Sequence, residues 1–140
     1  MNKDFLERAI QIAVNGHLGQ KDKGGNAYIL HPLRVMHKVK TKNEKIVALL
    51  HDVIEDTNVT LDDLRIEGFS EEIIYAIDCV TKREHENYKD YIERVKKSQI
   101  SRVVKLADLE DNCDLSRINN PTQKDIDRLN KYKKIIKKLE

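Results

Sequence analysis

Residues 49–57 read LLHDVIEDT and place one histidine and three carboxylates directly after a pair of leucines. The polar residues of this stretch are His51, Asp52, Glu55 and Asp56. Burying a carboxylate destabilises a fold unless a partner replaces its lost water. On a helix, residues four apart share a face. His51 therefore lies one turn before Glu55, and Asp52 lies one turn before Asp56. The stretch therefore predicts a polar site beside the core of a helical protein.

A divalent cation is the simplest partner for such a cluster, because it offsets both the repulsion between the acids and the loss of their hydration. For Glu55 and Asp56 alone, two solvated residues at the end of a helix explain the sequence more simply. His51 and Asp52 directly follow two leucines, and for them we favour a metal site over a hydrogen-bonded pair in the core.

Further ligands are expected elsewhere in the chain, because two side chains cannot hold a catalytic ion. His31 follows the glycine-rich loop GQKDKGGNAY and directly precedes Pro32, which restricts the local backbone. Asp108 is an isolated acid in the apolar stretch VVKLADL, and a salt bridge to a nearby basic residue explains it as well as metal binding does. His37 lies among lysines and is expected at the surface. His17 follows the end of a helix, where an imidazolium suits the helix dipole.

The bulk composition limits the classes of protein to which the chain can belong. Its 140 residues favour one domain, residues 1–140, and 39% apolar against 36% charged residues leave enough material for one core. A net charge of +2, with lysines and acids interleaved, does not favour nucleic-acid binding. No apolar run approaches the roughly 18 residues of a membrane helix. Cys79 and Cys113 lie far apart, which fits a reduced, cytoplasmic location better than a disulfide framework.

Helical periodicity dominates the rest of the sequence. The apolar stripe of a first helix ends near Gly16, and a central helix is expected over Ile46–Asp56. Ser70 suits a helix N-cap, and Pro121–Thr122 introduce a C-terminal packing helix over about residues 122–139. That last helix is expected to bury Ile126, Leu129, Tyr132, Ile136 and Leu139. The predicted fold class is all-α, with a single bundle of about seven or eight helices.

The His31–Pro32 step, the adjacent His51–Asp52 pair and the late Asp108 within KLAD together resemble the HD-domain metal-dependent phosphohydrolases. Within that superfamily, the chain is most similar to the hydrolase domain of RelA/SpoT-type alarmone enzymes and to the small stand-alone alarmone hydrolases. The stretches that carry the resemblance are KDKGGNAYILHP, ALLHDVIEDTNVTLDDL, VTKRE and VKLADLEDN. The resemblance covers about residues 5–118 and implies a helical HD-type fold.

The resemblance also implies a metal centre with an acidic pair beside it. The implied metal ligands are His31, His51, Asp52 and Asp108. Manganese, Mn²⁺, is the usual ion of the family, and two imidazoles with two carboxylates suit it better than a structural zinc. Glu55 and Asp56 match the acids that handle the attacking water in the family.

Positions near the nucleotide agree with the family only in part. The residues that match substrate positions are Lys21, Tyr28 and Asn112. At Gln20 the resemblance implies an arginine beside the guanine base, so this residue is a departure. Glu110 and Asp111 are a second departure, because the family usually carries basic or neutral residues there. Both departures concern the substrate and leave the implied metal ligands intact.

The leading hypothesis is a metal-dependent phosphohydrolase that converts guanosine-3′,5′-bis(diphosphate), ppGpp, to GDP and pyrophosphate. Gln20 keeps open a phosphatase for another nucleotide, such as a nucleoside monophosphate or NADPH. A nucleotide sensor without catalytic activity is a third alternative, although all implied ligands and both acids are present. We expect a small-molecule nucleotide as the partner, with no nucleic acid and no membrane. The sequence leaves the oligomeric state open.

Overall fold

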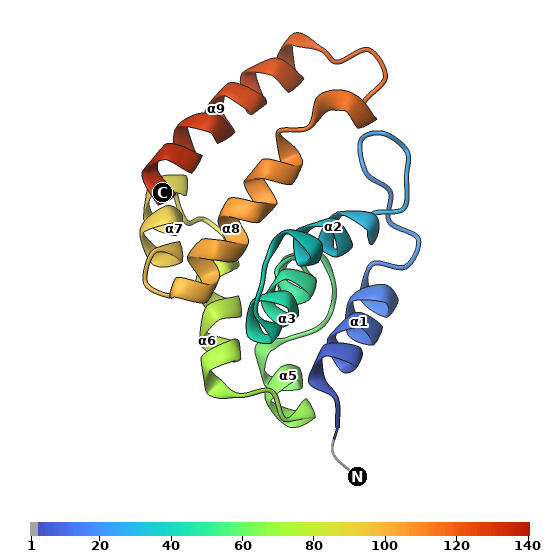
Figure 1. Ribbon diagram of the computed structural model, residues 1–140, viewed down its shortest axis with the longest axis vertical. Coiled ribbons are helices and arrows are strands. Elements are labelled where there is room, and N and C mark those ends of the chain that lie inside the picture. The colour runs from blue at the N-terminus through green and yellow to red at the C-terminus, as the bar shows by residue number, and fades with distance from the viewer. Residues whose placement is uncertain (1–2) are drawn as a thin grey trace.

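The computed structural model describes residues 3–140, where the regular elements are helices and one isolated β-bridge joins Lys21 to Ala27 (Figure 1). The elements are α1 (Phe5–Gly16), α2 (Leu30–Lys38), α3 (Lys42–Leu50), α4 (Val53–Asp56), α5 (Leu61–Glu67), α6 (Glu71–Val80), α7 (Tyr88–Val95), α8 (Gln99–Asn112), the 3₁₀ turn η1 (Leu115–Arg117) and α9 (Gln123–Leu139). The predicted all-α class is confirmed. The predicted domain began at residue 1, and residues 1 and 2 lie outside the described part of the chain.

Helix boundaries follow capping signals in the sequence. The Thr60 side chain accepts the backbone N–H of Asp63, and the Asp63 carboxylate accepts that of Thr60, so the first turn of α5 is satisfied reciprocally. Ser70 starts α6 in the predicted place by accepting the N–H of Ile73. Gly68 ends α5 with φ at 101°, a left-handed conformation that a side chain would disfavour.

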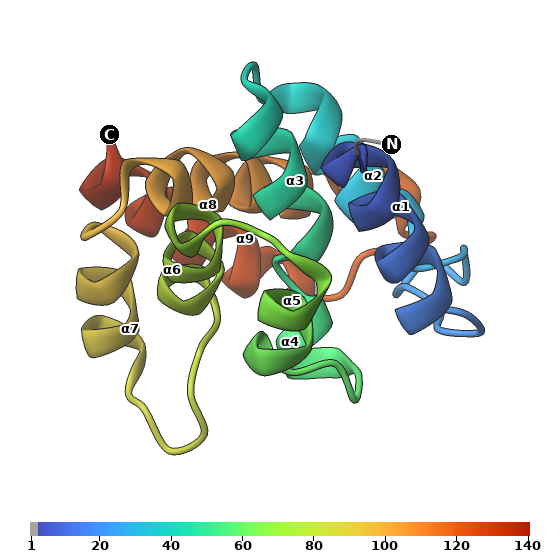
Figure 2. The same ribbon diagram turned by 90° about the horizontal axis from the view of Figure 1, so that it is seen from below.

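α8 lies at the centre of the arrangement. It packs against α2, α3 and α6, and α9 runs alongside it on the outside of the bundle (Figures 1 and 2). α3 also contacts α1, α2 and α6, so other helices enclose it. The packing therefore brings α2 and the C-terminal end of α3 together with α8, which lies far from both in the sequence.

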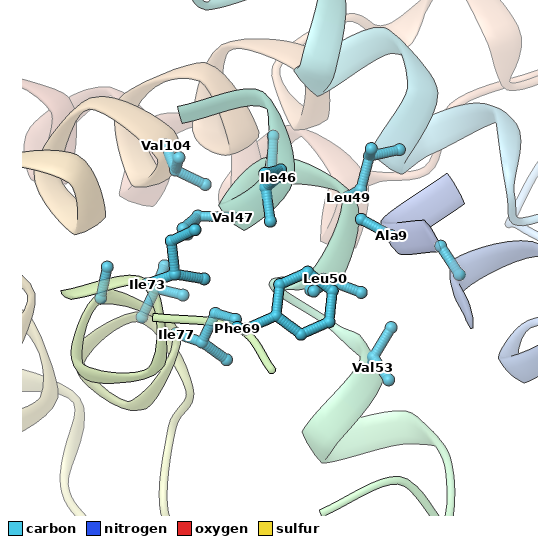
Figure 3. Close-up of a cluster of buried hydrophobic side chains, with 14 of the residues drawn as sticks. Ala9, Ile46, Val47, Leu49, Leu50, Val53, Phe69, Ile73, Ile77 and Val104 are labelled. Carbon is cyan, nitrogen blue, oxygen red and sulfur yellow. The ribbon is translucent and has the colours of Figure 1, made fainter. Parts of the chain in front are cut away.

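The enclosed position of α3 explains its continuous apolar run. Residues 46–50 are each at most 1% exposed, and they pack with side chains of α1, α6 and α8 (Figure 3). Full burial of one Leu, Ile or Val side chain contributes about 1.5–3 kcal/mol. A second, smaller apolar cluster joins α7, α8 and α9 through Tyr91, Ile92, Val95, Leu109, Ile135 and Leu139.

The C-terminal helix was predicted correctly in extent but not in every buried position. α9 spans 17 residues, and among residues 3–140 no helix has the length and apolarity needed to cross a membrane. Its expected inward residue Ile126 is 39% exposed, whereas Ile135 is 6% exposed. The two positions are nine residues apart in numbering, which is two and a half turns of an α-helix, so they lie on opposite sides. Ile135 belongs to the face that meets α8, and Ile126 therefore does not.

The predicted helix over Ile46–Asp56 is interrupted. α3 ends at Leu50, and α4 begins at Val53. His51 contributes to the break, because its ring Nδ1 bonds to the carbonyl oxygen of Ala48. In a continuous helix that carbonyl would accept the backbone N–H of residue 52. The interruption sets two polar residues, His51 and Asp52, at the end of a buried helix.

Candidate metal centre

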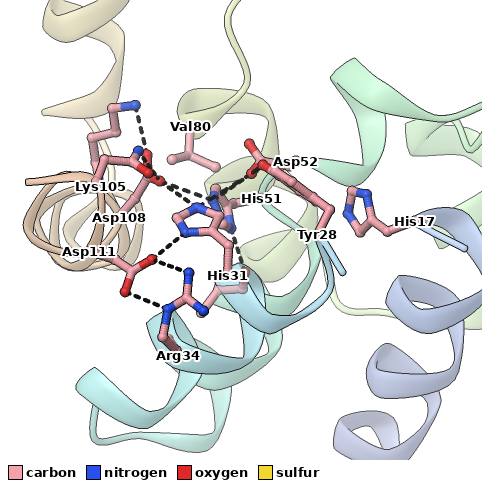
Figure 4. A network of polar contacts seen from close by, with 12 residues as sticks. His17, Tyr28, His31, Arg34, His51, Asp52, Val80, Lys105, Asp108 and Asp111 are labelled. Carbon is pink, nitrogen blue, oxygen red and sulfur yellow. Dashed lines mark hydrogen bonds and ion pairs between the residues drawn. The ribbon is translucent and has the colours of Figure 1, made fainter. Parts of the chain in front are cut away.

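Four side chains from three parts of the fold converge on one point (Figure 4). They are His31 of α2, His51 and Asp52 at the α3–α4 break, and Asp108 of α8. The Nε2 atom of His31 lies 2.9 Å from Oδ1 of Asp108 and 3.7 Å from Oδ2 of Asp52. The Nε2 atom of His51 lies 3.0 Å from the same Asp52 oxygen and 3.4 Å from Oδ1 of Asp108. The side chains predicted as ligands are therefore neighbours in space.

Both imidazoles turn the same ring nitrogen toward this point. Nδ1 of His51 faces the carbonyl oxygen of Ala48, and Nδ1 of His31 lies 2.7 Å from Oδ2 of Asp111. A carbonyl and an ionised carboxylate only accept hydrogen bonds, so in each ring Nδ1 carries the hydrogen. In the neutral form of each ring, Nε2 then presents its lone pair to the centre.

This donor set fits a divalent cation. Nε2 of His51 is buried and has no hydrogen-bond partner among residues 3–140, although Asp52 lies nearby. One donor atom each from His31, His51 and Asp108 lies within 4.8 Å of the others, and all three residues are buried. Imidazole nitrogen and carboxylate oxygen together are ligands typical of transition-metal sites with an octahedral preference. A cation would satisfy the unpaired nitrogen and both carboxylates at once.

The protonation equilibria of the centre show how strongly its charges interact. Burial raises the pKa of Asp52, but the interactions with His51 and His31 together outweigh burial and lower the pKa to about 2. Burial also raises the pKa of Asp108, whereas Lys105 and His51 together lower it well below its usual range. Burial lowers the pKa of His51, and the two carboxylates raise it well above its usual value. Positive charge at this point is therefore favoured, from an imidazolium or from a metal ion.

Neighbouring side chains orient the two carboxylates. Tyr28 donates its hydroxyl hydrogen to Oδ2 of Asp52. Asn112 donates to Oδ1 of Asp108 over 3.2 Å, and Lys105 donates to Oδ2 of Asp108 over 2.9 Å. Tyr28 and Asn112, which were predicted near the substrate, thus contact the predicted ligands directly.

Two clefts open beside the centre, with volumes of about 290 and 300 Å³. The first lies between the loop before α2, η1 and α9, and its lining includes Lys21, Tyr28, Arg34, Arg117 and Leu129. The second lies between α6, α7, α8 and α9, and its lining includes Glu55, Lys82, Tyr88, Lys105 and Lys131. His31 faces the first cleft and Asp108 the second, so the centre connects the two.

The acidic pair of α4 is divided between two surfaces. Glu55 lines the second cleft, and its Oε1 accepts the backbone N–H of Lys82 over 2.6 Å. Asp56 instead lines a separate groove with Asn15 and Thr57. Burial raises the pKa of both carboxyl groups, and the charge of Asp52 raises each of them further. Only Glu55 shares a cleft with the centre.

Comparison with known proteins gives the chain a family. It is 36% identical over 116 residues to a GTP pyrophosphokinase of Streptomyces coelicolor. The aligned residues make up 74% of this chain and 14% of that relative. It is 34% identical over 119 residues to a guanosine-3′,5′-bis(diphosphate) 3′-pyrophosphohydrolase of Aquifex aeolicus, covering 76% of this chain and 17% of the relative. A protein of the same name from Borreliella burgdorferi is 42% identical over 89 residues, or 57% of this chain and 13% of that relative. Over about three quarters of its length, the chain is homologous to proteins of the RelA/SpoT family.

The fold is also that of a RelA/SpoT-type protein. A solved structure described as a metazoan orthologue of SpoT that hydrolyses ppGpp superposes with a TM-score of 0.81 at 24% identity. The match covers 99% of this chain and 86% of that structure. The chain spans less than a fifth of the length of the Streptomyces and Aquifex relatives. No family model matches it.

Gln20, the first departure from the family pattern, takes part in the scaffold around the loop. The Gln20 side chain accepts from Nδ1 of His17 over 2.9 Å and donates to the backbone oxygen of Asp56 over 3.1 Å. Gln20 is not among the residues that line either cleft. His17 follows the end of α1 as predicted, and it is only 2% exposed because it lies between this amide and the ring of Tyr28.

The sequence analysis missed the partner of His31. Asp111 is 3% exposed and accepts from His31, Arg34 and Arg117. We had noted Asp111 only as a departure from the family. One local signal was available, because Arg34 follows His31 by three residues and shares its face of α2.

Proposed function

We propose that this chain is a metal-dependent phosphohydrolase and that its substrate is ppGpp, from which it releases the 3′-pyrophosphate. The observation that carries the proposal is the convergence of two imidazoles and two carboxylates between two clefts. Relatives named as ppGpp pyrophosphohydrolases support the choice of substrate. Because the chain spans only part of these relatives, their activity is assigned to it here as a proposal.

We assign metal binding to His31, His51, Asp52 and Asp108, with Mn²⁺ as the ion. Bound there, a divalent ion would make a water ligand more acidic and neutralise charge on the phosphoryl group. Tyr28, Lys105 and Asn112 would act on the ligand carboxylates, since each donates a hydrogen bond to one of them. These contacts fix the carboxylate oxygens before a metal or a substrate arrives.

We assign proton transfer from the attacking water to Glu55, assisted by Asp56. Glu55 lies in the second cleft, and burial raises its pKa toward neutral pH, the range in which a general base is most effective. The backbone N–H of Lys82 holds one carboxylate oxygen of Glu55, which leaves the other to face the cleft. Asp56 lines a different groove, so we assign it an electrostatic contribution to the pair.

The charges of the clefts support a substrate that extends across the centre. The second cleft has four cationic residues, Lys82, Lys105, Arg128 and Lys131, which suit a pyrophosphate. The first cleft combines cations such as Lys21 with apolar side chains, including Leu115, Ile118 and Leu129, which suit a nucleoside. We therefore propose that the nucleoside lies in the first cleft and the leaving pyrophosphate in the second.

The deciding experiment is a turnover panel with added Mn²⁺. It contains ppGpp, pppGpp, nucleoside mono-, di- and triphosphates and NADPH, with Asp52→Ala as the control. We expect pyrophosphate from ppGpp and no turnover by the control. Turnover of a nucleoside monophosphate or of NADPH alone would replace the substrate and keep the reaction class. Binding of nucleotides without any turnover would indicate a sensor, and equal turnover by the control would reject the proposed centre.

The cellular location is a separate part of the proposal. Cys79 and Cys113 are both free thiols, and Cys79 is buried. We propose a cytoplasmic location, in which such thiols stay reduced.

A further inference from the structure

Asp111 lies on the far side of His31 from the metal centre (Figure 4). Its Oδ2 is 2.7 Å from Nδ1 of His31, while Nε2 of the same ring is 2.9 Å from Asp108. The carboxylate is buried, at 3% exposure, and it comes from α8 whereas His31 comes from α2. One imidazole therefore bridges two acids of α8 that lie three residues apart.

Asp111 is held in place from both of its oxygens. Nε of Arg34 donates to Oδ1 over 2.8 Å, and Nη2 of Arg34 donates to Oδ2 over 3.1 Å, a two-point contact of the guanidinium. Arg117 donates to Oδ2 over 3.4 Å and to the backbone oxygen of Asp111 over 2.8 Å. The carboxylate is thus charged, paired and fixed in orientation.

The two histidines of the centre differ in what their Nδ1 atoms meet. His51 has a neutral carbonyl oxygen, that of Ala48, whereas His31 has the ionised carboxylate of Asp111. A carboxylate bound to Nδ1 fixes the tautomer, restricts rotation of the ring and makes Nε2 a stronger electron donor to a metal. His31 lies in the first turn of α2, directly after the loop that lines the first cleft.

We propose that Asp111, oriented by Arg34 and Arg117, is a positioning residue that fixes His31 as a metal ligand. The inference rests on the proposed function only in taking His31 to bind the ion. It does not require ppGpp to be the substrate. It assigns a role to a residue in which this chain departs from the pattern of its family.

The test measures Mn²⁺ binding without nucleotide, by calorimetry and by the loss of free-ion electron paramagnetic resonance signal. The variants are Asp111→Ala and Asp111→Asn, and Glu110→Gln is the matched control because Glu110 is an exposed acid on the same helix. We expect Asp111→Ala to weaken Mn²⁺ binding about 10- to 100-fold, the usual effect of losing the outer partner of a ligand histidine. Asp111→Asn keeps an acceptor oxygen without the charge and should retain part of the affinity. Glu110→Gln should bind like the parent chain.

A second readout follows the ring itself. In ¹⁵N-labelled protein loaded with Zn²⁺, long-range ¹H–¹⁵N spectra should show the hydrogen of His31 on Nδ1. In Asp111→Ala, the His31 signals should shift or broaden, while those of His51 should stay unchanged. Arg34→Met is a second variant for the case that Asp111→Ala does not fold. It keeps Asp111 and removes only its two-point partner, so it should weaken Mn²⁺ binding by less than Asp111→Ala does.

The outcomes separate this inference from the proposed function. If Asp111→Ala binds Mn²⁺ more weakly than the parent chain, and the parent chain leaves ppGpp intact, the inference is supported and the proposed function is rejected. Equal affinities of the parent, Asp111→Ala and Arg34→Met, with unchanged His31 signals, would overturn the inference and leave the function standing. A parent chain that binds no divalent ion would overturn both.

Discussion

Tyr28 donates its phenolic hydrogen to the Asp52 carboxylate and thereby joins the glycine-rich loop to the candidate metal centre. The ring of Tyr28 lies between two histidines, with centroids 4.9 Å from His17 and 5.7 Å from His31. Burial and the negative charge of Asp52 raise the pKa of the phenol far above its usual value, so the hydroxyl remains a donor at all physiological pH values. The loop that lines the first cleft is therefore fixed to a predicted ligand by one hydrogen bond.

Removing that hydroxyl should loosen the centre while preserving the fold. Tyr28→Phe keeps the buried ring and leaves Asp52 with one partner fewer. We expect Mn²⁺ affinity to fall about 10- to 100-fold, as for other outer partners of metal ligands. Calorimetric titration measures this, and Tyr75→Phe, which alters a half-exposed phenol on α6, is the control. Undiminished affinity in Tyr28→Phe would mean that the hydrogen bond has no part in orienting Asp52.

Shortening a core residue of α3 tests the packing behind the centre. Leu50 is completely buried and directly precedes His51. Leu50→Ala should lower the free energy of unfolding by about 2–5 kcal/mol, through lost burial and the remaining cavity. Leu18 is 80% exposed, so Leu18→Ala should change the stability by less than about 0.5 kcal/mol. Urea unfolding followed by circular dichroism compares them, and similar midpoints for the two variants would contradict the packing described for α3.

An ion pair away from the site predicts part of the acid sensitivity of the fold. Arg94 donates to both oxygens of Glu86, over 2.7 and 2.9 Å, and also to the backbone oxygens of Asp78 and Thr81. The hydrogen bonds from Arg94 lower the pKa of Glu86 from 4.5 to about 2. A carboxyl group whose pKa is lower in the folded state than in the unfolded state stabilises the fold at pH values above its unfolded-state pKa. That stabilisation is lost as the pH falls through the folded-state pKa.

For the Glu86–Arg94 pair, that loss should occur between about pH 4.5 and pH 2. Glu86→Gln should therefore be less stable than the parent chain at neutral pH, and the difference should shrink across this window. Urea midpoints measured from pH 7 to pH 2 test the expectation. A constant difference between the two chains at all pH values would show that the ion pair does not titrate with folding.

The helices were largely predictable because their signals are local. Ser70 marks the start of α6 through its own hydroxyl, and the apolar spacing that follows it identifies the buried face. The pair His51 and Asp52 could be singled out for a different reason, since the two residues are adjacent and their occurrence after two leucines is unusual. Ile126 was misjudged because apolar character alone does not say which side of α9 meets α8.

Other features depend on contacts that sequence spacing does not encode. The bond between His31 and Asp111 joins residues 80 positions apart, so the role of Asp111 appears only once α2 and α8 are packed. The break at His51 depends on a side chain that competes for a backbone carbonyl of its own helix. The division of Glu55 and Asp56 between two surfaces follows from that break, whereas a continuous helix had led us to treat them as one pair.

That division leads to a prediction about catalysis, which rests on the proposed phosphohydrolase activity. Glu55 lies in the second cleft near Lys105 and Asp108, whereas Asp56 lines a groove beside α1. If Glu55 accepts the proton of the attacking water, Glu55→Gln should lower kcat on ppGpp by about 10²- to 10⁴-fold, the usual contribution of a general base. Asp56→Asn should lower it much less, and neither variant should lose Mn²⁺ affinity. The matched substitutions remove one charge each from neighbouring residues, so a larger loss of kcat in Asp56→Asn would transfer the role of base to Asp56.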